Sequence, residues 1–385
     1  RHAGSDPPSR GVRPSGAHCL TEAGEGTVRS TLDGVSSVEI VIPRPDDWHV
    51  HLRDDEMLDA VVDHTARWFR YALVMPNLTP PVTSNASAQA YRARIMDAAS
   101  VGADTFVPQM TLYLTPTIDV DDLVEGFNAG VIGGVKFYPA GATTNSDAGG
   151  TNLLDFEATL SVMAEQKIPL LVHAESTDPE LDIFDREAAF LDQQVGPLLA
   201  AMPELSVTVE HISTAAGIDL VNEFDQAYGS ITPHHLSCDR SDLLANGMRP
   251  ELYCKPVINS ADNRRALAAA ATSGNPKFFL GTDSAPHPLS QKEARVAKAG
   301  IFNAPYGLQV TAELFHQADA LDQFVAFVSL NGAARYGHEP SSDELRLVRN
   351  DTLAEDIVEV ITTAAGDEVR LFGVAEAGRW SIAAV

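Results

Sequence analysis

The sequence predicts a (β/α)8 barrel, and three observations lead to this prediction. The chain has 385 residues, enough for one large α/β domain. Its short apolar runs alternate with amphipathic or alanine-rich stretches, the pattern of parallel strands buried on both faces. Polar residues recur at the ends of these runs, at intervals close to one βα unit of a barrel.

Eight apolar runs are the expected strands of the barrel. They cover residues 38–51, 71–77, 106–114, 133–138, 169–175, 205–212, 229–236 and 277–282. The expected helical stretches include residues 87–99, 121–129, 155–166, 262–271 and 309–316. An open doubly wound sheet is the main alternative. No Gly-x-Gly-x-x-Gly follows an early strand, which favours the barrel.

The first 38 residues differ in composition from the rest of the chain. They contain six Gly, three Pro and six Ser with few large apolar side chains, so they cannot bury enough surface to become ordered. We therefore expect residues 1–38 to be a disordered extension and residues 39–385 to form one barrel domain. Two apolar runs near the C-terminus, 356–362 and 368–372, are expected to pack on the bottom of the barrel.

Charge and cysteine content exclude several classes of protein. The formal net charge of −26 disfavours nucleic-acid binding, which needs clustered Lys and Arg. No apolar run approaches the roughly 20 residues that a membrane-spanning helix needs. Cys19, Cys238 and Cys254 show no paired spacing, so neither a disulfide framework nor a cysteine zinc site is expected. These features predict a cytoplasmic protein.

A His-x-His motif ends the first expected strand. Side chains alternate along a strand with a period of two, so His49 and His51 project to the same side. Imidazole is the commonest side-chain ligand of transition metals, which makes this pair a candidate metal site. Because a single pair of this kind is also compatible with surface or core histidines, the prediction depends on further ligands.

Further charged or metal-binding residue types end other expected strands. They are Lys136, His173, His211 and Asp283, on expected strands four, five, six and eight. The first three are 37 and 38 residues apart, and the last follows after 72, close to one and two βα units. Since active sites of such barrels lie at the C-terminal ends of the strands, we expect one shared site. Buried ionisable groups are costly, which favours a metal site over isolated core residues.

Lys136 is unusual in this set, because an ammonium group has no lone pair to offer a metal. A buried lysine can lose its proton, and the neutral amine can react with CO₂ to form a carbamate. Such a carbamate can bridge two metals, with a hydroxide between them at a spacing of roughly 3.5–4 Å. One metal would then be held by His49, His51 and Asp283, and the other by His173 and His211.

Several segments resemble the amidohydrolase superfamily, and within it the dihydroorotases of the shorter bacterial type (class II). The matching segments span about residues 40–305, and the remainder is weaker but collinear. They are Arg-Pro-Asp-Asp-Trp-His-Val-His-Leu-Arg-Asp, Val-Met-Pro-Asn-Leu-Thr-Pro-Pro-Val-Thr, Val-Lys-Phe-Tyr-Pro-Ala, Leu-Val-His-Ala-Glu, Asp-Ile-Phe-Asp-Arg-Glu, Glu-His-Ile-Ser-Thr, Gly-Thr-Asp-Ser-Ala-Pro-His and Phe-Asn-Ala-Pro.

The resemblance implies a zinc-dependent hydrolase that reversibly cyclises N-carbamoyl-L-aspartate to L-dihydroorotate in de novo pyrimidine (UMP) biosynthesis. It implies two zinc ions bridged by carboxylated Lys136 (N6-carboxylysine), a metal-bridging hydroxide as nucleophile, and Asp283 as general acid and base. It also implies a homodimer. The metal ligands that it implies are His49, His51, Lys136, His173, His211 and Asp283.

A substrate carboxylate requires a fixed cation in the site. Arg53 lies two residues past His51, on the same strand face, and its planar fork suits a carboxylate. The substrate-binding residues that the resemblance implies are His51, Arg53, Asn77, His173 and His287, with backbone contacts from Lys255 and Ala299. Lys255 departs from the apolar residue expected at that position.

Residues 141–150 form a small, glycine-rich segment after the lysine strand, the composition of a mobile loop. The resemblance implies that this loop closes over the substrate through Thr143 and Thr144. Closure would exclude water from the site and strengthen electrostatic interactions there.

Other functions are compatible with part of this pattern. A different cyclic amidohydrolase, such as a hydantoinase or an allantoinase, would share the histidines and the bridging lysine. Arg53, Asn77 and the Thr143-Thr144 pair favour a ring that carries a carboxylate. A catalytically silent scaffold would have lost ligands that this sequence keeps, and a metal-buffering protein would hardly need a barrel of this size.

Overall fold

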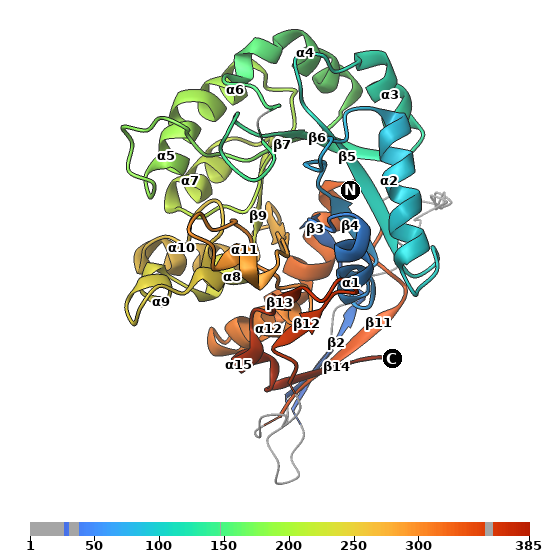
Figure 1. Cartoon of the computed structure of the whole chain (residues 1–385), viewed down its shortest axis with the longest axis vertical. Helices are drawn as coiled ribbons and strands as arrows, with labels where there is room; N and C mark the ends of the chain where they lie inside the picture. Colours follow the sequence, from blue (N-terminus) through green and yellow to red (C-terminus); the bar gives the residue numbers. More distant parts are fainter. Residues whose placement is uncertain (1–26, 31–37, 147, 351–356) are drawn as a thin grey trace, which may run out of the picture.

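The prediction of a (β/α)8 barrel is confirmed. The computed structural model describes the chain except residues 1–26, 31–37, 147 and 351–356. Eight parallel strands form one sheet in chain order (Figure 1). They are β3 (Asp47–Val50), β4 (Tyr71–Val74), β5 (Val107–Tyr113), β6 (Ile132–Phe137), β7 (Leu170–Val172), β8 (Val207–Val209), β9 (Ala227–Ile231) and β10 (Phe278–Leu280).

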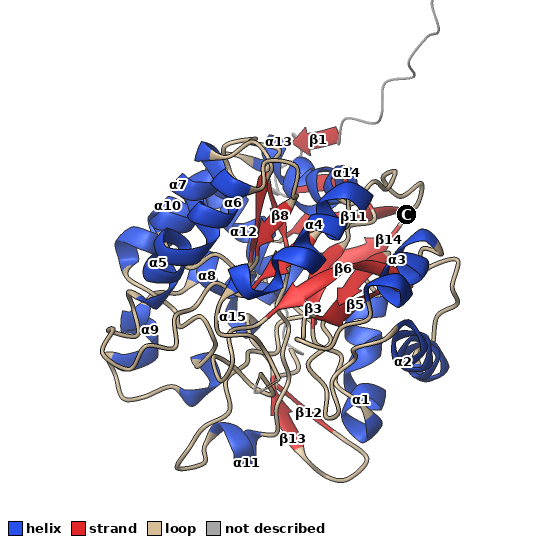
Figure 2. Cartoon of the chain, turned by 90° about the horizontal axis from the view of Figure 1, so that it is seen from above, coloured by secondary structure: helices blue, strands red, loops and turns tan. Residues whose placement is uncertain are grey.

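Helices lie around these strands (Figure 2), and capping residues begin several of them. Ser84 caps α2, Asp119 caps α3 and Ser260 caps α10. The helices are α1 (Asp55–Ala66), α2 (Asn85–Ala98), α3 (Val120–Asn128), α4 (Glu157–Gln166), α5 (Arg186–Phe190), α6 (Gly196–Ala201), α7 (Ala215–Glu223), α8 (Pro233–Ser237), α9 (Arg240–Leu244), α10 (Ala261–Ala271), α11 (Leu289–Lys292), α12 (Gly307–Gln317), α13 (Leu321–Val325), α14 (Asn331–Arg335) and α15 (Val374–Ala377). Shorter helical segments are η1 (Leu153–Phe156), η2 (Leu191–Val195), η3 (Pro250–Leu252) and η4 (Ala326–Leu330).

The expected seventh strand, residues 229–236, is only partly a strand. The strand β9 ends at Ile231, and residues 233–237 form the helix α8. Thr232 caps this helix by accepting a hydrogen bond from the backbone N–H of His235, and Pro233 occupies its first turn. These local signals outweigh the apolar character of the segment.

The expected first strand, residues 38–51, is also divided between two sheets. Residues Val38–Pro43 form β2, which belongs to a four-stranded antiparallel sheet in the order β1-β2-β11-β14. The barrel begins only at β3, after Pro43 and Pro45, which lack the N–H groups that a continuous ladder would use. The other strands of this terminal sheet are β1 (Thr27–Ser30), β11 (Glu344–Arg349) and β14 (Trp380–Ala384).

The strand β1 lies within the stretch expected to be disordered, so residues 27–30 differ from that expectation. It pairs with β2 over four residues. The rest of residues 1–37 lies outside the described part of the chain.

The N-terminal end of the barrel is closed by aromatic packing. An inner cluster contains Trp48, Leu73, Leu171 and Phe279, one from each of four strands. Tyr336, directly after α14, stacks on Trp48 with ring centres 4.5 Å apart. The β3–β4 register shifts between Asp47 and Val50. This irregularity is consistent with the Trp48 indole joining the cluster although its neighbour His49 also faces inward.

The expectation that the two C-terminal apolar runs pack on the barrel bottom is wrong for their described parts, because Ala333 of α14 and Tyr336 pack there instead. Of the two C-terminal runs, the described parts form the strands β12 (Val360–Thr362) and β13 (Glu368–Arg370). They pack Val369 and Leu371 against Val61 and Phe302. Figure 2 shows this pair and β1 at opposite ends of the molecule. Among the described residues, no helix is both long and apolar enough to cross a membrane.

A buried carboxylate joins the terminal sheet to the barrel helices. Glu313 of α12 accepts hydrogen bonds from Arg349 Nε at 2.8 Å and from Trp380 Nε1 at 2.8 Å, so it contacts β11 and β14 together. Burial alone would raise the pKa of Glu313, but these hydrogen bonds outweigh burial and lower it to about 2. The ionised carboxylate therefore stabilises the folded chain.

Replacing this carboxylate should give a stability loss that depends on pH. We expect Glu313→Gln to reduce the free energy of unfolding at pH 7 by about 2 kcal/mol, because charge-assisted hydrogen bonds are lost. The pKa of Glu313 is lower in the folded state, so its contribution is complete above about pH 5 and is lost as pH falls toward 2. Urea unfolding at pH 7 and pH 3 measures this, and a difference that is equal at both would contradict it. Glu359→Gln, on an exposed residue, is the control.

Candidate metal centre

The strand ends bring the predicted ligands to one face of the barrel. His49 lies within β3 and His51 just beyond it, and Lys136 is the penultimate residue of β6. Asp283 follows β10, while His173 and His211 follow β7 and β8. In barrel order these are the first, fourth, fifth, sixth and eighth strands, so the predicted strand assignment is confirmed.

Three ligand atoms converge at the closure of the barrel. His49 Nε2 lies 3.3 Å from His51 Nε2 and 3.3 Å from Asp283 Oδ1. His51 Nε2 lies 3.1 Å from the same carboxylate oxygen. Burial lowers the pKa of His51 to about 3, although Asp283 opposes this. Its imidazole is therefore neutral near pH 7 and carries a lone pair for a metal.

A second pair of imidazoles lies beside the first group. His173 Nδ1 is 3.1 Å from His211 Nε2, and the ring centres of His49 and His211 are 5.0 Å apart. Burial lowers the pKa of His173 and of His211 as well, so both imidazoles are neutral near pH 7. The two groups form one continuous cluster of five predicted ligands.

Lys136 is fully buried in this cluster. Burial lowers the pKa of its ammonium well below the ordinary value. Its Nζ donates to Glu210 Oε2, and the other oxygen of this carboxylate lies 3.0 Å from His49 Nδ1. Glu210 therefore lies beside Nδ1 of the His49 imidazole, while Asp283 lies beside its Nε2.

The backbone is constrained at three of these positions. Arg53, His211 and Asp283 have φ of 61°, 43° and 46°, in the left-handed region that is uncommon for residues other than glycine. Such conformations cost on the order of 1–3 kcal/mol each and persist only where surrounding contacts enforce them. Here they turn the chain at the end of a strand.

A buried carboxylate closes the barrel beneath the ligands. Asp47 accepts hydrogen bonds from Thr282 N at 2.8 Å and from Thr282 Oγ1 at 2.6 Å. Two backbone hydrogen bonds also join these strand ends. Asp283 N donates to His49 O, and His51 N donates to Ser284 O. They fix the first and eighth strands in the register that places the histidine pair against Asp283.

A small cavity lies over the cluster. Its lining includes His51, Arg53, His173, Lys255 and Asp283. Arg53 is oriented by its Nε, which donates to Pro286 O at 3.1 Å, and by its Nη2, which lies 3.0 Å from His287 Nε2. Burial and the charge of Arg53 lower the pKa of His287 to about 2, so its neutral ring accepts this hydrogen bond. These two contacts hold the Arg53 guanidinium beside the cavity.

The loop after β6 lies over this cavity. Thr143 and Thr144 line it, and Asn77 Nδ2 donates to Thr144 O at 3.0 Å. Ser146 holds the loop turn, because its Oγ accepts from Thr143 N and donates to Thr143 O. Asn77 therefore connects the end of β4 with the loop, which the sequence alone does not reveal.

The two predicted backbone contacts belong to neighbouring segments. Ala299 and Lys255 both line the cavity. Lys292, which is 5% exposed, donates to Tyr253 O at 2.7 Å and to Gly300 O at 2.6 Å. Its ammonium thus joins the two segments, one residue beyond Ala299 and two residues before Lys255.

Several residues of the site escape the sequence analysis. Asp47, Glu175, Glu210, Thr282 and Lys292 are buried and contact the ligands or their supports. All but Lys292 lie inside motifs already quoted, where no role was assigned to them, and Lys292 lies five residues beyond one of these motifs. Acidic residues directly before or two positions after a ligand histidine were the available signal.

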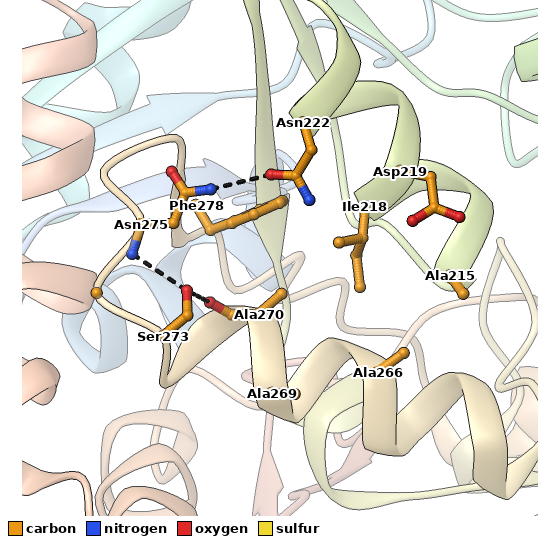
Figure 3. A pocket seen from close by; sticks show the side chains of 11 residues that line it. Ala215, Ile218, Asp219, Asn222, Ala266, Ala269, Ala270, Ser273, Asn275 and Phe278 are labelled. Atoms are coloured by element: carbon orange, nitrogen blue, oxygen red, sulfur yellow. Dashed lines mark hydrogen bonds between the residues drawn. The ribbon is translucent and has the colours of Figure 1, made fainter.

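An open cavity elsewhere differs in chemistry. It lies between α7 and α10, with Ala266, Ala269 and Ala270 on one side and Ile218 on the other (Figure 3). Asn222 and Asn275, which precede β9 and β10, are hydrogen bonded to each other there at 3.0 Å. Asp219 is the single titratable residue in its lining, which carries no group of metal ligands among the described residues.

The residues of the cluster fit divalent metal ions. Two ligand atoms at roughly 2.0–2.1 Å from a tetrahedral zinc ion are about 3.3 Å apart, and the contacts at the barrel closure are 3.1–3.3 Å. His51 Nε2 lies within 3.3 Å of both His49 Nε2 and Asp283 Oδ1, and a neutral imidazole has one proton, so this nitrogen can donate a hydrogen bond to only one of them. His211 Nδ1 has no hydrogen-bonding partner among the described residues. The donor set of imidazole and carboxylate is one that zinc accepts.

Comparisons with known proteins give the same picture. The model of the amidohydrolase family matches residues 40–342. A dihydroorotase of Synechococcus sp. (strain CC9605) is 49% identical over 342 residues, covering 89% of this chain and 98% of that protein. A dihydroorotase of Ruegeria pomeroyi is 50% identical over 315 residues, covering 82% and 91%.

Solved structures agree in fold. The dihydroorotase of Saccharomyces cerevisiae in complex with 5-fluoroorotic acid has a TM-score of 0.81 and 29% identity, covering 90% of this chain and 98% of that chain. The dihydroorotase of Campylobacter jejuni has a TM-score of 0.78 and 32% identity, covering 89% and 96%. An L-hydantoinase of Arthrobacter aurescens, at a TM-score of 0.68 and 17% identity, covers 83% and 78% and shares the fold.

Removing the hydroxyl of Thr282 should weaken the contact between the first and eighth strands of the barrel. We expect Thr282→Val to reduce the free energy of unfolding by about 1.5–3 kcal/mol, because Asp47 loses a donor to a charged, buried oxygen. Thr111→Val is the matched control, since it removes one bond to the carbonyl of Val74 and should cost only about 1 kcal/mol. Urea unfolding of both variants, with metal content measured beside it, decides. Equal losses of stability in the two variants would show that the Thr282 hydroxyl contributes no more than the Thr111 hydroxyl.

Proposed function

The chain belongs to the amidohydrolase family, and within it to the dihydroorotases, and we propose that it interconverts N-carbamoyl-L-aspartate and L-dihydroorotate in pyrimidine synthesis at this cluster. One observation carries the proposal. The carboxylate of Asp283 meets two neutral imidazoles at 3.1 and 3.3 Å, beneath a cavity that also contains the guanidinium of Arg53. A proton-transferring group and a carboxylate-binding group thus face one small space.

Two metal ions fit the proposed site. His49, His51 and Asp283 would hold one, and His173 and His211 the other. Zinc, when bound, would polarise the amide carbonyl and lower the pKa of water in the site. The spacing of these side chains and the neutrality of the four imidazoles near pH 7 support this proposal.

Carboxylated Lys136 is the proposed bridge between the metals. Burial favours the neutral amine, whose nitrogen can attack CO₂ and release one proton to form the carbamate. In the unmodified chain this nitrogen contacts Glu210. Carboxylation would convert this amine into an anion, which would hold the metals in place of the contact with Glu210.

Asp283 is the proposed general acid and base. Burial alone would raise the pKa of Asp283, but His49 and His51 outweigh burial and hold it well below the ordinary value. The carboxylate is therefore ionised and can accept the proton of an attacking water molecule. It then delivers that proton to the ring nitrogen as the amide bond breaks, and the reverse steps operate in cyclisation.

The remaining residues orient the substrate. Arg53, held by Pro286 O and His287, binds the substrate carboxylate in a fork. Asn77 and the loop with Thr143 and Thr144 cover the ring and exclude water. The backbones of Lys255 and Ala299 supply further hydrogen bonds, and Lys292 keeps their two segments together.

We further propose that the protein is cytoplasmic and forms a homodimer. Cys238 and Cys254 are both free thiols, which agrees with a reducing cytoplasm. The homodimer follows from the family resemblance, and sedimentation of the purified chain tests it.

The decisive experiment measures turnover of L-dihydroorotate by the zinc-loaded protein, with hydantoin and dihydrouracil beside it and zinc counted in the same sample. We expect preference for dihydroorotate and about two zinc ions per chain. Two zinc ions with preference for an uncharged ring would keep the metal centre and overturn the substrate assignment. Turnover by protein that binds one zinc ion or none would overturn the binuclear centre.

Asp283→Asn should separate chemistry from substrate binding. We expect kcat for dihydroorotate to fall at least about a hundredfold, because an amide cannot carry the proton between water and the ring nitrogen. Zinc should largely remain, since the amide oxygen and two histidines still face the ion. Steady-state kinetics and zinc content measure both effects. Near-normal kcat would remove Asp283 from proton transfer.

Arg53→Met should change substrate preference more than general activity. We expect kcat/KM for dihydroorotate to fall about a hundredfold or more, since a charged pair in the site is lost. The value for a neutral cyclic imide should change far less. Parallel kinetics on the two substrates measure this, and equal losses on both would place Arg53 away from the substrate carboxylate.

A further inference from the structure

A buried ion pair lies beside the second pair of imidazoles. Glu175 Oε1 accepts from Lys255 Nζ at 2.6 Å, and Glu175 Oε2 lies 3.0 Å from His173 Nε2. Glu175 is 2% exposed, and the lysine side chain is 13% exposed. The carboxylate thus connects a lysine from the segment before α10 with a histidine at the end of β7.

The positive charge of Lys255 pairs with a carboxylate of the protein itself. Its position was expected to be apolar, and an uncompensated ammonium would compete with Arg53 for a substrate carboxylate. The contact with Glu175 neutralises it, because a buried carboxylate requires a nearby cation. Lys255 and Glu175 therefore form one unit, because either charge would be buried without a partner if the other residue were absent.

The contact of Glu175 with His173 determines which nitrogen is free. An ionised carboxylate accepts hydrogen bonds only, so Nε2 of the imidazole must carry the proton. The lone pair then lies on Nδ1, which is 3.1 Å from His211 Nε2. A histidine ligand whose other nitrogen is bound by a carboxylate keeps both its tautomer and its ring orientation.

We propose that Lys255 and Glu175 are positioning residues that hold His173 with Nδ1 directed to the second metal. The inference rests on the proposed metal centre and deepens it. Lys255 orients Glu175, Glu175 orients the imidazole, and the substitution of a cation for the expected apolar residue is explained by this arrangement rather than by substrate binding.

A purely structural ion pair would behave differently in one measurable property. Loss of a structural pair lowers the stability of the fold and leaves zinc affinity intact. Loss of a positioning pair weakens zinc binding, by roughly 10- to 100-fold for residues of this kind. Zinc affinity of the metal-depleted chain, measured by competition with a chromogenic chelator, therefore separates the two roles.

The experiment compares Lys255→Leu, Glu175→Gln and the double variant with the wild-type chain. We expect each single variant to bind one of the two zinc ions roughly 10- to 100-fold more weakly. The double variant should be no worse than the weaker single variant, because the two residues act as a unit. Lys255→Arg, which keeps the charge, should restore zinc affinity to within threefold.

Controls keep the outcome interpretable. Lys298→Leu makes the same substitution at an exposed residue and should leave zinc binding unchanged. Lys255→Gln replaces Lys255→Leu if that variant does not fold, as judged by circular dichroism. Zinc affinity within twofold of wild type in both single variants overturns the inference while the metal centre stands. A wild-type chain that binds no zinc overturns the proposed metal centre itself.

Discussion

Closure of the barrel between β3 and β10 is the constraint on which the site depends. The two strands are separated by more than 220 residues, yet backbone hydrogen bonds and the Asp47–Thr282 contact fix their register. This register places His49 and His51 against Asp283. Ligands held by a closed sheet cannot move independently, so the site is organised before any metal or substrate arrives.

Charge is arranged differently inside the site and on the whole molecule. The chain carries a formal charge of −26, so a dicarboxylate substrate approaches against an unfavourable field. Within the site Glu175 is paired with the ammonium of Lys255, and Glu210 contacts the buried amine of Lys136. Arg53 then remains as the cation that faces the cavity with a neutral imidazole, His287, at its side.

The two ends of the barrel have separate tasks. The N-terminal end is packed with aromatic rings, where Trp48 meets Tyr336, and has no ligand among its described residues. The C-terminal end contains the ionisable groups, and Arg53, His211 and Asp283 have left-handed backbone conformations there. Packing at the N-terminal end offsets the conformational cost at the C-terminal end. Barrels of this kind usually separate stability and function in this way.

The amino-acid sequence was sufficient to predict the barrel and the strand ends that bear His49, Lys136 and Asp283. These depend on local pattern: apolar runs, a period of two, and the spacing of βα units. The family followed from its motifs. The folded chain was needed to show that β2 leaves the barrel, that α14 closes its bottom, and that Lys255 pairs with Glu175 across 80 residues. Apolar runs look alike whichever sheet they join, and a side chain's partner across the chain depends on where loops return. Local periodicity contains no information on either.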